Sequence, residues 1–150
     1  MPRKYQTPNF LGETLAPAKY ERWLQRKAVA HRTRDRKRGN KEATIAGYKT
    51  AIHKAVIFSE GRDIYTGEQL DWALISTYDN ERSKGERRAY KASLALLPTV
   101  DHLNDGLGPA DFAICAWRTN DAKNDLDADQ FVALCRRVVA HADGLNDVSA

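Results

Sequence analysis

Three polar side chains with the chemistry to hydrolyse a phosphodiester lie close together in the second half of the chain. Asp101 and His102 follow a short apolar run over 96–100, and Asn120 follows a second apolar run over 112–117. A neutral imidazole can take a proton from water. Carboxylate and amide oxygens are hard donors of the kind that magnesium accepts, and a cation held by them stabilises charge on a phosphate. These residue types predict His102 as a general base, with Asp101 and Asn120 as ligands of Mg²⁺ or Mn²⁺.

A hairpin must position these side chains. The two apolar runs are separated by a loop that contains Gly106, Gly108 and Pro109, residues typical of the connection between paired strands. After the second run the pattern changes to a short polar helix or turn. Adjacent residues of a strand point to opposite faces, so Asp101 and His102 can serve one site only if the strand ends or bends there. We expect the glycine-rich loop to permit that bend.

This segment resembles the HNH nucleases, also called the ββα-metal or His-Me finger family. The family pattern is an Asp-His pair at the end of one strand, a middle Asn early in the second strand, and a His or Asn that opens a helix and is commonly followed by a Lys. Asp101-His102 matches the first element, and Asn120 with Lys123 matches the last. The resemblance covers roughly residues 60–142. It implies a single-metal DNA endonuclease in which His102 activates water and Asp101 and Asn120 hold the metal.

The remaining family positions are occupied differently. The middle Asn aligns with Asp111, which we expect to steady the loop by hydrogen bonding. Lys123 is a predicted phosphate contact, and Arg118 is a second candidate unless it pairs with a nearby aspartate. Many family members bind a structural zinc through two Cys-x-x-Cys pairs, whereas this chain has only Cys115 and Cys135. No structural zinc is expected.

Positive charge is concentrated at the start of the chain. Residues 1–60 contain 14 Lys and Arg against 5 Asp and Glu, whereas residues 61–150 contain 10 against 15. Binding a polyanion through its backbone requires such a basic segment, although a charge run can also be a solvated helix face. We therefore predict a basic helical nucleic-acid-binding region over 1–60 and an HNH-type core with flanking helices over 61–150. The predicted contacts in the basic region are Arg32, Arg34, Arg36, Lys37 and Arg38.

The spacing of apolar residues predicts an α+β fold that is mostly helical, with one two-stranded hairpin followed by a helix as the catalytic core. A first helix begins at Pro17 and ends near Gly39, and Asn40 is expected to cap a second. A further helix is predicted over 83–96. The last helix opens at Asp127 and should cover the hairpin.

Three histidine and cysteine side chains are predicted to have no chemical role. His31 is expected to be an exposed, incidental residue among arginines. Cys115 in the second strand and Cys135 in the last helix are expected to be small buried hydrophobes.

The cellular setting and the partners follow from composition. Two cysteines do not make a disulfide framework, which favours a reducing cytoplasm. No apolar run approaches a membrane span and the N-terminus lacks a secretory signal, so no membrane partner is expected. DNA is favoured over RNA as the partner, and a homodimer is left open.

Two other functions remain open. One is a DNA-binding protein that keeps an HNH-like fold but does not cut. The other is a basic helical interaction protein in which Asp101-His102 is a chance pair in a loop.

Overall fold

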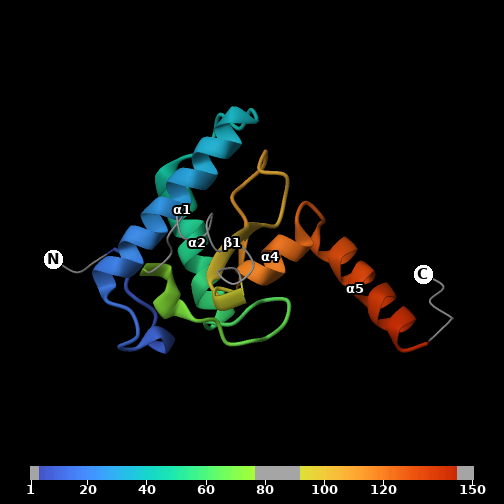
Figure 1. Cartoon of the computed structure of the whole chain (residues 1–150). Helices are drawn as coiled ribbons and strands as arrows, with labels where there is room; N and C mark the ends of the chain where they lie inside the picture. The colour runs from blue at the N-terminus through green and yellow to red at the C-terminus, as the bar shows by residue number, and fades with distance from the viewer. Residues whose placement is uncertain (1–3, 77–91, 145–150) are drawn as a thin grey trace.

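A computed structural model describes residues 4–76 and 92–144 (Figure 1). The predicted mostly helical α+β class is confirmed, with one antiparallel two-stranded sheet. The elements in chain order are a 3₁₀ turn Asn9–Leu11, α1 Pro17–Lys37, α2 Ile45–Ser59, a 3₁₀ turn Trp72–Ser76, β1 Pro98–His102, β2 Phe112–Ala116, α4 Trp117–Lys123 and α5 Ala128–Ala142. The helix predicted over 83–96 falls mostly outside the described residues.

Helices α1 and α2 form an antiparallel pair (Figure 1). As predicted, α1 starts with Pro17, whose missing N–H would be unsatisfied in a first turn anyway. Its buried side includes Tyr20, Trp23, Leu24 and Ala28, which recur at helical spacing. The buried side of α2 includes Tyr48, Ile52, Ala55 and Val56. Each helix is therefore held by one apolar stripe rather than by its many charges.

The predicted cap of α2 is wrong. The side chain of Thr44, not Asn40, accepts the N–H of Gly47 at 3.1 Å. Asn40 lies four residues before Thr44, and its side-chain amide instead donates to the carbonyl of Gly106 at 2.7 Å. A short connection between the helices leaves Asn40 free to bind the loop of the hairpin.

The two strands pair in regular antiparallel register. Asp101 is opposite Ala113, and His102 is opposite Phe112. Side chains therefore alternate between two faces up to the last residue of β1. The face with His102 lies against α1 and α2, and the face with Asp101 lies against α4.

One hydrophobic core joins the two regions that the charge distribution separates. Trp23 of α1 meets Trp72 edge-to-face with ring centroids 5.4 Å apart, and both side chains are fully buried. Ile52 of α2 and Ile114 of β2 belong to the same cluster. The basic region 1–60 thus supplies much of the packing that supports the hairpin.

The expectation that α5 covers the hairpin is wrong. The helix opens at Asp127 as predicted, with a capping box between Asp127 and Gln130, but Leu134 is 44% exposed and Val138 is 59% exposed. Helix α4 ends at Lys123, Asn124 adopts a positive φ of 52°, and the chain then leads α5 away from the sheet (Figure 1). Cys135 is exposed with this helix, whereas Cys115 is buried as predicted.

Candidate functional site

His102 lies in an aromatic setting on the helix-facing side of the hairpin. Its ring centroid is 4.7 Å from that of Phe112 and 4.9 Å from that of His31. Its Nε2 is 2.9 Å from a carboxylate oxygen of Asp35. Burial lowers the pKa of His102 and outweighs the opposing attraction of Asp35. The imidazole is therefore neutral at pH 7, which is the state that a general base requires.

Asp35 and Tyr48 form the second layer on this face. Asp35 is fully buried in the last turns of α1, and Tyr48 of α2 donates its hydroxyl to Asp35 Oδ2 at 2.6 Å. Burial raises the pKa of Tyr48 to about 12, with the neighbouring carboxylate acting in the same direction, so the hydroxyl keeps its proton. His31, expected to be exposed, is buried beside His102. The prediction for His31 is wrong because α1 packs along the hairpin.

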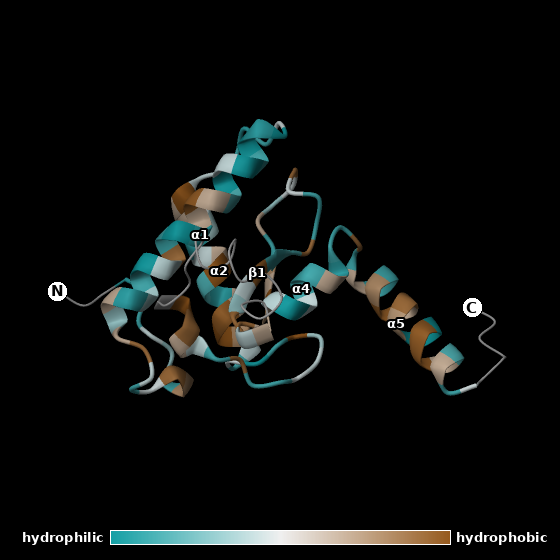
Figure 2. Cartoon of the chain, in the orientation of Figure 1, coloured by the Kyte–Doolittle hydropathy of each residue, from teal (hydrophilic) through white to brown (hydrophobic). Residues whose placement is uncertain are grey.

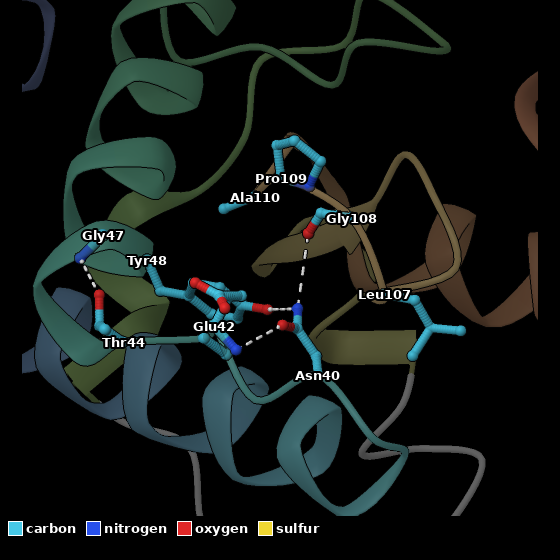
Figure 3. A pocket seen from close by; sticks show the side chains of 10 residues that line it. Asn40, Glu42, Thr44, Gly47, Tyr48, Leu107, Gly108, Pro109 and Ala110 are labelled. Carbon is cyan, nitrogen blue, oxygen red and sulfur yellow. Dashed lines mark hydrogen bonds between the residues drawn. The ribbon is translucent and has the colours of Figure 1, made fainter.

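The side chain of Asn40 holds the loop between the strands next to Asp35 and Tyr48. Figure 3 shows Asn40 directed at the loop, where its amide reaches the carbonyl of Gly108 at 3.4 Å in addition to that of Gly106. A cavity of about 380 Å³ lies between the loop and the start of α2, and Tyr48 lines it. Within the loop, Asn104 donates to the carbonyl of Pro109 at 2.9 Å. Two asparagines therefore hold the loop.

Asp111 does not hold the loop in the way expected. Its side chain is exposed and makes no hydrogen bond within residues 4–76 and 92–144. Only its backbone takes part, since its carbonyl accepts the N–H of Leu103 at 3.0 Å. Asp111 precedes β2 and points outward, which leaves the loop to Asn40 and Asn104.

The opposite face of the hairpin carries a buried ion pair. The Nζ of Lys123 is 3.2 Å from Asp101 Oδ2, and both side chains are almost fully buried. The hydroxyl of Tyr65 donates to the same carboxylate oxygen at 2.9 Å. Lys123 was predicted as a phosphate contact; in this structure its ammonium neutralises Asp101.

Asp63 fixes the surroundings of that ion pair. Its carboxylate accepts from Thr119 Oγ1 at 2.6 Å and from the backbone N–H of Ala116 at 3.1 Å, which ties it to the start of α4. Its other oxygen accepts the N–H of Tyr65 at 2.7 Å, within the turn that contains Thr66 and Gly67. Asp63 thus aligns the Tyr65 turn and α4 on either side of Asp101. Its position before a Thr-Gly turn was the only sequence signal of this role.

The predicted residues are only partly brought together. Asp101 and Lys123 are in contact, and Asn120 lies half-buried one turn earlier on α4. His102 points to the opposite face, because β1 continues regularly through its last residue. The bend expected at the end of this strand is absent.

The donor types at Asp101 and Asn120 fit a magnesium ion, which is commonly held by one or two carboxylates with water and substrate phosphate completing the shell. Both oxygens of Asp101 face Lys123, at 3.2 and 3.5 Å. A cation bound to Asp101 would therefore share the carboxylate with Lys123 or displace it. In the described part of the chain, no cluster of three or more His, Cys, Asp or Glu is arranged to hold a metal.

The predicted nucleic-acid contacts lie at two places. Arg34, Arg36, Lys37 and Arg38 are exposed at the end of α1, and Arg32 is half-buried. Figure 2 shows this end of α1 as hydrophilic. Arg118 is the second residue of α4 and forms an exposed ion pair with Glu68. An acidic partner was anticipated for Arg118, although a glutamate takes that place instead of an aspartate.

No protein-family model, no curated protein and no solved structure matches this chain. Among residues 4–76 and 92–144, no helix has the length and apolar character needed to cross a membrane. The likeness to HNH nucleases consequently depends on the sequence motif.

Proposed function

We propose that this protein is a metal-dependent endonuclease of the HNH type that hydrolyses phosphodiester bonds in DNA. The observation that carries the proposal is the contact of Asp101 with α4. The hairpin runs directly into this helix, so Asp101 of the Asp-His pair contacts the helix that carries Asn120 and Lys123, whereas His102 faces α1 and α2. This order of elements is the one that the motif implies.

The state of His102 supports the assignment of a base. Burial lowers its pKa, so the ring is uncharged at neutral pH; 13% of its side chain is exposed, and both ring nitrogens are buried. In the proposed reaction the end of β1 rearranges so that His102 and Asp101 serve one site, and His102 takes a proton from the attacking water. Asp101 and Asn120 would hold the magnesium or manganese ion, which when bound supplies electrostatic stabilisation of charge on the phosphate.

The basic end of α1 would bind the DNA backbone. Its exposed arginines and lysine lie on the same side of the hairpin as His102, because Asp35 in the same stretch of helix contacts that ring. Neutralising phosphates releases counterions and supplies affinity without sequence preference. The division into a binding region over 1–60 and a catalytic core over 61–150 remains part of this proposal.

A DNA-binding protein that does not cut is the second candidate. The buried ion pair between Lys123 and Asp101 favours this candidate, because the ammonium already balances the carboxylate charge that would otherwise attract a metal ion. In this alternative the basic end of α1 binds DNA, and Asp101 and His102 carry out no reaction.

The deciding experiment is plasmid cleavage by purified protein. Wild type, His102→Ala and His141→Ala are incubated with supercoiled plasmid in Mg²⁺, in Mn²⁺ and in EDTA, and the products are resolved on a gel. His141 is an exposed histidine of α5 and provides the matched control. We expect nicking or linearisation by wild type and His141→Ala, loss in EDTA, and loss in His102→Ala.

Binding is measured on the same samples by gel shift. Retained binding by His102→Ala together with lost cleavage assigns the residue to the chemical step. If all three proteins shift the plasmid and none cuts it in either metal, the nuclease proposal fails and the non-cutting DNA-binding protein stands.

A further inference from the structure

Asp35 is a fully buried carboxylate that the motif does not include. Its Oδ2 is 2.6 Å from the Tyr48 hydroxyl and 2.9 Å from His102 Nε2. Its Oδ1 has no hydrogen-bond partner in the part of the chain that the structure describes. Burying a carboxylate costs several kcal/mol unless charge and hydrogen bonds compensate. The two groups next to the Asp35 carboxylate are the hydroxyl of Tyr48 and the imidazole of His102, the predicted general base.

The loop that follows His102 closes over this carboxylate. Gly106 has a φ of 80°, and a Cβ added there would lie 2.6 Å from Asp35 Oδ1. Its carbonyl is held by Asn40 at 2.7 Å. Only a glycine permits this approach, so the loop and the end of α1 shield Asp35 together.

We propose that Asp35 is a positioning residue for His102, accepting the Nε2–H of its imidazole and leaving Nδ1 free to receive a proton from water. This inference rests on the proposed nuclease function. In the reaction one proton passes from water to Nδ1, the water oxygen bonds to phosphorus and the bond from phosphorus to the leaving oxygen breaks. The leaving oxygen takes a proton from solvent, and the imidazolium afterwards returns its proton to solvent. The carboxylate stabilises the imidazolium that forms, as a buried aspartate does in a Ser-His-Asp triad.

The surroundings of the ring support this orientation. Phe112 and His31 pack against the imidazole, which restricts its rotation. Burial lowers the pKa of His31 to about 3, with Arg34 acting in the same direction, so His31 adds no positive charge beside Asp35. The Nε2 of His102 is at ion-pair distance from Asp35 but is not aligned for a hydrogen bond. Both ring nitrogens are buried and neither has another partner in the described residues, so water reaches Nδ1 only after the surrounding side chains move. A small rotation of the ring aligns the Nε2–H with Oδ2, because the two atoms are already at hydrogen-bond distance.

The first test is the ¹H–¹⁵N spectrum of the histidine rings in the full chain, without DNA or metal. The His102 signal is assigned by its loss in His102→Gln. We expect wild type to show a downfield, slowly exchanging Nε2–H, because a charged acceptor makes a stronger hydrogen bond than a neutral one. In Asp35→Asn this signal moves upfield and exchanges faster, whereas the control Asp105→Asn, an exposed loop residue, leaves it in place. A wild-type ring protonated on Nδ1, or an unchanged signal in Asp35→Asn, overturns the proposal.

The second test is steady-state cleavage of a DNA oligonucleotide. Asp35→Asn is expected to lower kcat by roughly 100-fold and to change KM by less than about twofold, since the carboxylate acts on the base and not on DNA binding. Asp35→Leu combined with Tyr48→Phe removes both buried partners at once, which limits the cost to folding, and should show the same loss. A kcat of Asp35→Asn equal to that of wild type overturns the inference. If wild type itself does not cleave, the nuclease proposal fails, and the ring spectrum still decides whether Asp35 orients His102.

Discussion

The two faces of the hairpin handle buried polar groups in different ways. On one face the Asp101 carboxylate is neutralised by the ammonium of Lys123, a residue close by in sequence on the next helix. On the other face a neutral imidazole lies among aromatic rings and is approached by Asp35, a carboxylate from the opposite end of the chain. One face therefore holds the Asp101 carboxylate with its charge already balanced, whereas the other holds the His102 imidazole, which can still accept a proton.

This difference shows why neighbouring residues of one motif need not share a site. A regular strand turns Asp101 and His102 to opposite faces, and each takes its chemistry from the element packed on that face. The Asp101 face is closed by α4 and the Tyr65 turn, whereas the His102 face is closed by α1 and α2. Four experiments test this contrast between the faces, and the ion pair of Asp101 is expected to give the largest effect.

Breaking the ion pair should be the most damaging change. Asp101→Leu leaves the ammonium of Lys123 buried without its counter-charge, which typically costs about 3–5 kcal/mol. Urea unfolding followed by circular dichroism measures the loss. The double variant Asp101→Leu with Lys123→Met removes both charges and should recover most of that stability. A single variant less than about 1 kcal/mol below wild type would show that the pair is not buried as described.

Acid should destabilise the histidine face through His31. The pKa of His31 is about 3 in the folded protein, against an ordinary value of 6.5. Between these values the unfolded chain binds more protons than the folded one, so the free energy of unfolding falls as the pH drops from about 6.5 towards 3. At pH 4 this amounts to on the order of 3 kcal/mol.

Denaturant unfolding between pH 4 and pH 8 measures this dependence. His31→Phe keeps an aromatic ring in the contact with Phe112 and should flatten the profile. His141→Gln, on the exposed side of α5, should leave the profile as in wild type. Equal slopes in wild type and His31→Phe would contradict the burial of His31.

The basic end of α1 should determine how tightly the protein binds DNA on its His102 face. Replacing Arg36, Lys37 and Arg38 by Gln is expected to weaken binding and to flatten the dependence of log K on log salt by about one for each lost phosphate contact. Fluorescence anisotropy over a salt series measures both. Arg136→Gln with Arg137→Gln on α5 is the matched charge control and should change the slope little. A larger loss of binding in the α5 variant than in the α1 variant would assign the DNA contacts to α5.

The smallest effect is expected at the surface of the Asp101 face. Glu68→Gln removes the exposed ion pair with Arg118, and such pairs contribute at most about 1 kcal/mol. Thermal unfolding should show a correspondingly small shift. The same change frees Arg118, so tighter DNA binding by Glu68→Gln would identify this arginine as a phosphate contact, and unchanged binding would remove it from the site.

The local elements could be predicted from sequence because short-range rules decide them. Pro17 and the apolar stripe of α1, the start of the last helix at Asp127 and the glycine-rich loop between the strands all depend on a few neighbouring residues. The burial of Cys115 within an apolar strand follows from the same reasoning. These predictions required no knowledge of how the helices pack.

Apart from the bend expected at the end of β1, the main failures concern contacts between distant parts of the chain. Asn40 has the residue type of a helix cap, but a loop 66 positions away in sequence offers it a carbonyl. Helix α5 has the stripe of a packed helix, yet the turn after Lys123 leads it away from the hairpin. A sequence pattern specifies which side of a helix is apolar, but it does not specify which surface that side meets.

The sequence by itself determined the candidate chemistry: an Asp-His pair ending one strand, an Asn-x-x-Lys in the following helix and a basic segment near the start of the chain. Only the tertiary structure decided the environment of each group. Packing of α1 and α2 on one face of the hairpin buries His102 beside Asp35, and packing of α4 on the other pairs Asp101 with Lys123. The physical reason is that charge state and orientation depend on burial and on nearby charges, which are set by residues far apart in sequence.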